Sequence, residues 1–283
     1  MKLLRCIDLC NCKRMVKLPG GIGKLRQLRY LSLLNSGINN IPRGFSGLTN
    51  LRVLKGFPAH VEGDWCSLEE LGPLNRLTSL DIRGLENVSY STFAIKVKLG
   101  EKVHLIYLCL QCTSGRGGSH RLIKEEEQQQ IEKVFDEICP PPCLENPRIK
   151  ECPELKVLEG LPALQRLDLE DYDMKTLPRY LKDANPRLFD LDCNASLLAS
   201  IAKGESSSEW NKFSHIKQVN AHADDKENNI ERKWYVKYTR DPLSLKTNIS
   251  PSTNASSGDE TEEVLLDEVE ETSKDEIQEE RVV

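Results

Sequence analysis

Apolar residues recur along the chain in the order L-x-x-L-x-L, so that the last two apolar positions of each copy are two residues apart. Copies begin at Leu4, Leu28, Leu51, Leu77, Leu105, Leu144, Leu164 and Leu188, with intervals of 24, 23, 26, 28, 39, 20 and 24 residues. Alternation with period two predicts a short strand with one buried side. About 24 residues are enough to bring the chain back and lay the next strand parallel, about 4.8 Å away. The pattern therefore predicts an array of parallel strands.

This spacing is the signature of leucine-rich repeats, in which each repeat buries its leucines only against its neighbours. We expect an α/β solenoid of about eight repeats over residues 1–195, with a parallel concave sheet and an irregular or short helical convex side. The position after the strand takes a small side chain that satisfies turn backbone groups, which gives Cys12, Cys112 and Cys152 structural roles. The Leu18-Pro19 and Ile41-Pro42 pairs, and the pair at Leu177, are expected to end the convex segments.

Two repeats depart from the rule. Gly56 stands where the third repeat needs an inward leucine, and Pro147 removes a backbone donor from the sixth, so we expect the sheet to be least regular there. A loop and helix insertion is predicted over residues 113–138. A capping region follows over 196–247, with a helix at Leu197–Ile201 and strands near Val219 and at 234–238. Residues 248–283, polar and acidic, are expected to form a disordered tail.

The charge is uneven along the chain. Residues 259–280 contain twelve carboxylates, and only Lys274 and Arg281 are basic after Gly258, so residues 1–258 hold 37 basic and 32 acidic residues. This surplus is too small and scattered to indicate a nucleic-acid surface. The longest apolar runs fall far short of the roughly 20 residues that span a bilayer, and no signal-peptide core is present. We expect a cytoplasmic protein that binds neither nucleic acid nor membrane, with its ten cysteines reduced.

No motif for catalysis is recognisable. The Gly20–Lys24 cluster lacks the first glycine and the final Ser or Thr of a phosphate loop, because Leu18 and Leu25 occupy those positions. A convex turn is the better interpretation. The Cys109/Cys112 and Cys139/Cys143 pairs have spacings that zinc accepts, but the repeat register already places Cys112 in the core. The histidines are scattered. We therefore expect no enzyme activity, no cofactor and no metal.

The variable positions between the leucines form the concave face, the surface on which a solenoid of this type binds its partners. The first four repeats place mainly basic residues there, and repeats six to eight mainly acidic ones, among them Asp171. Because Arg and Tyr dominate interface energetics, they lead the predicted partner-binding set. That set comprises Arg29, Tyr30, Arg52, Asp81, Arg83, Tyr107, Arg166 and Asp168. Arg29 and Tyr30 are expected to be neighbours on one strand, and Arg52 and Arg83 to occupy comparable positions on later strands, so that all four meet one acidic partner surface together.

Several segments resemble the carboxy-terminal repeats of plant intracellular nucleotide-binding leucine-rich-repeat disease-resistance proteins of the coiled-coil type. The resemblance covers roughly residues 3–245 and is carried by the motifs at Lys17–Leu25, Ser67–Leu74, Asp81–Val88 and Cys152–Gly160. It implies a non-enzymatic recognition module that senses a pathogen effector or a modified host protein. The receptor's own nucleotide-binding domain is a further expected partner.

The first repeat contains Met1, so the resemblance predicts a truncated receptor with neither a coiled-coil nor a nucleotide-binding domain. Its uncovered first repeat is then expected to self-associate. Two alternatives stay open. One is an intracellular repeat adaptor, such as the substrate-binding subunit of a ubiquitin ligase, and the other is a receptor remnant without function.

Overall fold

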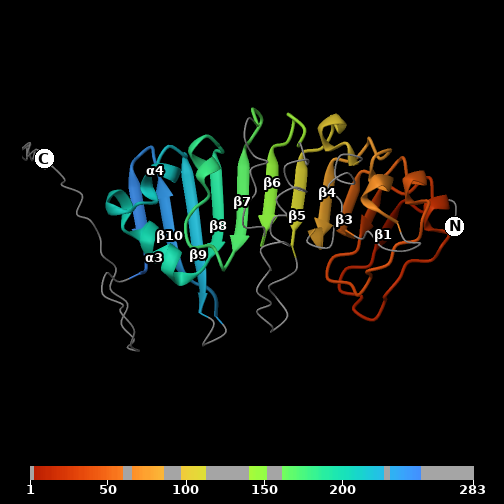
Figure 1. Cartoon of the computed structure of the whole chain (residues 1–283), viewed down its shortest axis with the longest axis horizontal. Helices are drawn as coiled ribbons and strands as arrows, with labels where there is room; N and C mark the ends of the chain where they lie inside the picture. The colour runs from red at the N-terminus through yellow and green to blue at the C-terminus, as the bar shows by residue number, and fades with distance from the viewer. Residues whose placement is uncertain are drawn as a thin grey trace, which may run out of the picture. The chain divides into compact units, whose positions relative to one another are not determined.

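The computed structural model describes residues 3–59, 66–85, 97–112, 140–151, 161–225 and 230–249 (Figure 1). The predicted insertion at 113–138, the role of Cys152 and the predicted tail from residue 250 onward lie outside these ranges. Asn248 and Ile249, which we had assigned to the tail, are described. The Asn248 side chain accepts a hydrogen bond from the Tyr235 amide, and Ile249 packs against the core.

The described residues form one eleven-stranded sheet in which the strands follow one another in chain order (Figure 1). Strands β1 to β9 run parallel, and β10 and β11 are antiparallel additions at the carboxy-terminal side. The bounds are β1 Cys6–Asp8, β2 Tyr30–Ser32, β3 Val53–Pro58, β4 Ser79–Arg83, β5 Tyr107–Gln111, β6 Asn146–Lys150, β7 Arg166–Asp171, β8 Leu188–Cys193, β9 Gln218–Asp225, β10 Ile230–Thr239 and β11 Ser244–Thr247. This is the predicted leucine-rich-repeat solenoid.

The sheet register follows the apolar pattern. Ile7, Leu31, Leu54, Leu80 and Leu108 lie opposite one another on successive strands. From Leu31 onward these side chains are almost fully buried, whereas Ile7 in the first strand is only half-buried. The inward residues thus form one continuous core along the sheet, and each repeat depends on its neighbours for burial.

Short 3-10 helices close the repeats on the side away from the open strand face. They are η1 Ile22–Lys24, η2 Phe45–Gly47, η3 Leu68–Leu71, η5 Leu99–Glu101, η6 Arg179–Lys182 and η7 Gly204–Ser206. Gly23 lies so close to the next turn that a Cβ there would stand 2.0 Å from the Gly44 carbonyl oxygen, so only glycine fits. The Gly20–Lys24 cluster is therefore part of a convex turn, as the repeat register predicted.

The third repeat has no leucine at its second inward position, and a β-bulge places a different apolar residue there. Leu54 pairs with Leu80, but the next inward residue opposite Ile82 is Phe57, because Gly56 inserts one extra residue with φ +72°. Phe57 is fully buried and its ring lies 5.6 Å from that of Phe45. The expected irregularity is present as a register shift, and the strand nevertheless continues to Pro58.

The sixth repeat is more regular than we expected. Strand β6 pairs with β5 along its whole length, and the buried Pro147 lies opposite Leu108. Pairing with β7 begins only at Arg148, which lies opposite Asp168. The missing proline N–H thus affects only the β7 side of the strand, because successive residues of a strand direct their N–H groups to opposite neighbours.

The register that we predicted for the eighth repeat is wrong by two residues. Phe189, Leu191 and Cys193 are the inward residues of β8, and Phe189 lies opposite Leu167. Leu188 lies opposite Arg166 and is only half-buried. A leucine at the expected interval misled the prediction, because Phe189 fills the inward position that leucine normally occupies.

Two helices and an antiparallel hairpin follow the last repeat. Helix α3 (Ala195–Ala202) is capped by the Asn194 side chain, which accepts a hydrogen bond from the Leu197 amide. Helix α4 (Trp210–Phe213) places two aromatic rings against Tyr238 of β10, with centroids 5.3 and 5.6 Å away. The helix at 197–201 and the strands near 219 and at 234–238 were predicted correctly.

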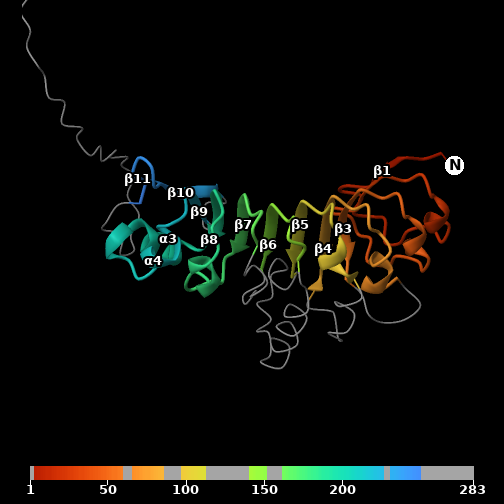
Figure 2. The same cartoon turned by 90° about the horizontal axis from the view of Figure 1, so that it is seen from above.

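Both helices lie on the same side of the sheet as the 3-10 turns (Figure 2). The other side is the concave side of the curved sheet, and within the described ranges no helix covers it (Figure 2). The fold therefore leaves one broad strand surface exposed, and its side chains are the candidates for function.

Candidate functional site

The open surface consists of rows of side chains that run across the strands. One row comprises the residues that lead into the strands, namely Arg5, Arg29, Arg52, Thr78, Ile106, Glu145, Gln165 and Arg187. The outward residues of the strands themselves form the next rows, which we call the concave face. One of these rows contains Asp81, Cys109, Arg148, Asp168, Asp190 and Asn220, and Ser32 lies opposite Lys55 on the other side of the bulge in β3. The register thus brings residues 20 to 39 positions apart in sequence side by side.

Three successive arginines occupy the leading row at its amino-terminal side. We call Arg5, Arg29 and Arg52 the arginine row. The Arg29 amide donates to the Arg5 carbonyl at 2.8 Å, and the Arg52 amide donates to the Arg29 carbonyl at 2.9 Å. All three side chains are exposed, and none forms an ion pair with a residue in the described ranges.

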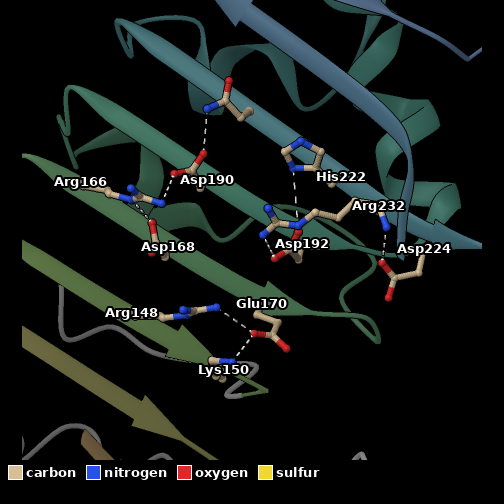
Figure 3. A network of polar contacts seen from close by, with 11 residues as sticks. Arg148, Lys150, Arg166, Asp168, Glu170, Asp190, Asp192, His222, Asp224 and Arg232 are labelled. Carbon is tan, nitrogen blue, oxygen red and sulfur yellow. Dashed lines mark hydrogen bonds and ion pairs between the residues drawn. The ribbon is translucent and has the colours of Figure 1, made fainter. Parts of the chain in front are cut away.

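The part of the open surface from β6 to β10 is different, because there the charged side chains contact one another (Figure 3). We call this group the central network. Its members are Arg148, Lys150, Arg166, Asp168, Glu170, Asp190, Asp192, Asn220, His222 and Arg232. Several of them line a pocket on the concave face.

Glu170 anchors one side of the network. Its side chain is only 6% exposed and accepts from Lys150 at 2.5 Å and from Arg148 at 3.4 Å, both on the neighbouring strand β6. A buried carboxylate needs such partners because desolvation opposes its charged form. The two cations compensate Glu170, while the Arg148 side chain remains 44% exposed.

Arg166 connects the next two strands. Its Nε lies 2.6 Å from Asp168, and its Nη2 lies 2.7 Å from Asp190 on β8. Asp190 also accepts a hydrogen bond of 2.8 Å from the Asn220 side chain on β9. One guanidinium thus holds two carboxylates, and hydrogen bonding to Asp168 raises the pKa of Arg166.

Arg232 enters the network from the antiparallel hairpin. The pairing of β9 with β10 shifts between Ile230 and Trp234, and Arg232 lies within this bulge with φ +51°. Its guanidinium lies 2.6 Å from Asp192, and its amide donates to Asp224 at 2.8 Å (Figure 3). Nearby, burial and the Arg232 charge lower the pKa of His222, whose Nδ1 lies 3.9 Å from Asp192.

These contacts correct the predicted acidic half of the face. We had counted Asp171 among its acids, but Asp171 lies opposite Cys193 in the inward row, where it accepts a hydrogen bond from the Asp173 amide. Burial raises the pKa of Asp171. The remaining acids of strands β7 and β8 have Lys150 or arginine partners. The central part of the face is therefore charge-compensated rather than acidic.

Arg83 is not placed as we predicted. Val53, the residue after Arg52, lies opposite Ser79, four positions before Arg83, so Arg83 lies at the far end of its strand. Its guanidinium donates to the carbonyl oxygens of Gly56 and Ile38. Burial lowers the pKa of Arg83. Arg29 and Arg52 share one row, but Arg83 instead joins backbone segments of earlier repeats.

The other predicted residues lie on the concave face. Tyr30 and Tyr107 occupy the same row, and Tyr107 is 54% exposed. Asp81 is half-buried beside Cys109, and burial raises the pKa of both the carboxyl and the thiol. The aromatic rings are thus available to a partner, whereas Asp81 is largely shielded.

The predicted partner-binding set contained only Arg166 and Asp168 of the central network, and the residues that it omitted include Arg232, Asn220 and His222. Alternation in β9, where Asn220 and His222 stand between the buried Val219, Ala221 and Ala223, would have identified two of them. No local pattern marks Arg232, because its position depends on the bulge and on pairing with a distant strand.

Cys109 and Cys112, whose spacing would suit zinc, do not lie together. Cys109 lies on the concave face and Cys112 in the core, so their side chains lie on opposite sides of the sheet. Cys143 contacts the carbonyl oxygens of Lys102 and Leu105, and Cys139 lies outside the described ranges. Among residues whose placement is described, no three His, Cys, Asp or Glu side chains are grouped for a metal ion.

A parallel sheet with one repeat per strand, buried leucines and 3-10 turns on one side defines a leucine-rich-repeat protein. Residues 68–195 match the family model described as R13L1/DRL21 LRRs. The chain is thus similar, over this portion, to the leucine-rich repeats of resistance-type proteins. The matched portion contains most of the central network but not the arginine row. The comparison with curated proteins gave no match. None of the helices in the described ranges is long and apolar enough to cross a membrane.

Proposed function

We propose that the chain is a non-enzymatic protein-recognition module of a plant intracellular disease-resistance receptor of the coiled-coil, nucleotide-binding type. The observation that carries the proposal is the open concave face, which is lined by aromatic and charged side chains. Solenoids present such extended concave surfaces to protein partners. The similarity of residues 68–195 to resistance-type repeats supports the same conclusion.

Within this proposal, the module acts in defence by binding a pathogen effector, a modified host protein or the nucleotide-binding domain of a receptor in the cytoplasm. Tyr107 and Tyr30 supply apolar contact area, and Arg166 with Asp168 supplies oriented polar groups. Their mutual ion pair holds both side chains in place, so a partner orders fewer rotatable bonds on binding. Arg29 and Arg52 add the positive charge that attracts a partner.

Site-specific photo-cross-linking tests the proposal. A photoreactive amino acid replaces Tyr107 on the concave face or, as the matched control, the exposed Lys182 on η6. The full chain is expressed in plant cells with and without pathogen challenge. We expect defined protein adducts from position 107 that are missing from position 182. No adduct at 107, or the same adducts at both positions, would refute recognition through the concave face.

A further inference from the structure

The arginine row places three exposed positive charges side by side on neighbouring repeats. A charged surface can keep a protein soluble without aligning like charges in this way. Arg5, Arg29 and Arg52 each stand immediately before one of three adjacent strands, which lie about 4.8 Å apart. Each is flanked along the chain by uncharged residues, a leucine before it and Cys6, Tyr30 or Val53 after it. Three positive charges thus stand in register with no acidic neighbour on either side in sequence.

Such an arrangement destabilises the free protein slightly. Like charges directly opposite each other on neighbouring strands repel, and salt screens exposed charges only in part. Elsewhere on the sheet, carboxylates of the protein itself neutralise an arginine, since Arg166 lies between Asp168 and Asp190. The arginine row has no such partner within the described ranges, so its guanidinium groups are available to acidic groups of a bound molecule.

We propose that the arginine row binds an extended acidic segment of a protein partner, which lies across strands β1 to β3. This inference rests on the proposed function and names the chemistry of the partner. An extended segment places every second side chain on one side, about 6.6–6.8 Å apart. The long arginine side chains span the difference between this spacing and that of the strands. Their planar guanidinium groups accept carboxylates in bidentate fashion.

The surroundings favour a peptide over a nucleic acid. Asp8 is exposed on β1, and Asp81 follows Leu80, which lies opposite Leu54 of β3, so carboxylates lie near the arginine row on the concave face. A continuous phosphate backbone would approach these carboxylates. A peptide presents discrete carboxylates on one side and uncharged backbone on the other. The half-buried Tyr30 ring offers apolar contact beside the row.

Fluorescence anisotropy with labelled twelve-residue peptides tests the inference. One peptide has Glu at alternate positions, a second has the same composition with its Glu residues in one block, and a third has Gln in place of Glu. The titration uses the full chain, with the carboxylates of residues 259–280 replaced by amides so that they do not compete. We expect the alternating peptide to bind tightest and the Gln peptide not to bind.

The Arg5→Glu, Arg29→Glu, Arg52→Glu variant should weaken binding of the alternating peptide at least about 10-fold. The matched control reverses three exposed cations outside the sheet, Lys175, Arg179 and Lys182, and should retain affinity. Equal loss in both variants, equal affinity for the alternating and block peptides, or equally tight binding of single-stranded DNA would overturn the inference. Because the photo-cross-link is placed at Tyr107, the proposed function can hold even if the arginine row binds no acidic segment.

Discussion

The amino-terminal and central parts of the same open surface differ in whether their charged side chains have ion-pair partners within the described ranges. In the central network, Glu170, Asp168, Asp190 and Asp192 each have a basic partner within 3.4 Å or less. In the arginine row, three exposed guanidiniums share a register and have no ion-pair partner in the described ranges. The repeat geometry is the same in both parts. The identity of the residues at the variable positions makes the difference.

This difference indicates that charge on a repeat surface has two separate uses. Partly buried carboxylates in the central network are compensated because an unpaired buried charge would destabilise the fold. Exposed arginines tolerate the absence of a partner because water solvates them, so they remain free to attract one. We therefore expect substitutions in the network to change stability and substitutions in the row to change binding.

The largest effect is expected from Glu170→Ala. The substitution leaves Lys150, whose side chain is only 20% exposed, without this carboxylate. We expect the free energy of unfolding to fall by about 2–3 kcal/mol, less than for a fully buried pair because Arg148 is partly solvated. Urea denaturation measures it. The control is Asp241→Ala, which removes an exposed pair with Arg240 and should cost less than about 0.5 kcal/mol. Equal costs would show that Glu170 is not a structural anchor.

A smaller loss is expected from Arg166→Ala. This change removes the cation between Asp168 and Asp190, but both carboxylates and the Arg166 side chain reach solvent. We expect a loss of about 1 kcal/mol, measured in the same way. Arg187→Ala changes an exposed arginine in the leading row beside it and should stay within about 0.5 kcal/mol. A neutral Arg166→Ala variant would mean that the contacts seen around it contribute nothing to stability.

His222 should give the central network a weak pH dependence. Burial lowers its pKa below the ordinary value of 6.5, so the unfolded chain binds more protons between these two values. The free energy of unfolding should therefore decrease as the pH falls below 6.5. His222→Gln should flatten this part of the curve, measured by thermal unfolding from pH 7 to pH 5. An unchanged slope in the variant would assign the pH dependence to other groups.

The sequence predicted the solenoid because inward leucines at period two determine both strand and register. It could not predict that Phe57 would replace a leucine through a bulge, since that depends on Gly56 and on packing against Phe45, one repeat earlier. Leu188 was misplaced because an isolated leucine at the right interval matches the pattern as well as Phe189 does. Register within one strand is fixed by packing with its neighbours, which a single sequence shows only indirectly.

For the candidate site, the sequence predicted well which residues would face outward. It predicted less well which other residues they would contact. Tyr107 and Arg166 are on the concave face, as expected. Arg83 was expected at a position comparable to that of Arg52, but the structure places it at the other end of its strand. Arg232 joins Asp192 across 40 positions in sequence, and no local pattern predicts such a contact.

The most direct test of the distinction between the two regions is the stability of the variant Arg5→Gln, Arg29→Gln, Arg52→Gln. This variant removes three positive charges and retains polar side chains of similar length, so urea denaturation at low and high salt isolates their mutual repulsion. At low salt we expect an unchanged free energy of unfolding or a gain of up to about 0.5 kcal/mol, which disappears at high salt. A loss of more than about 1 kcal/mol would show that the arginines stabilise the fold, and would contradict the account of this row as a surface kept for binding.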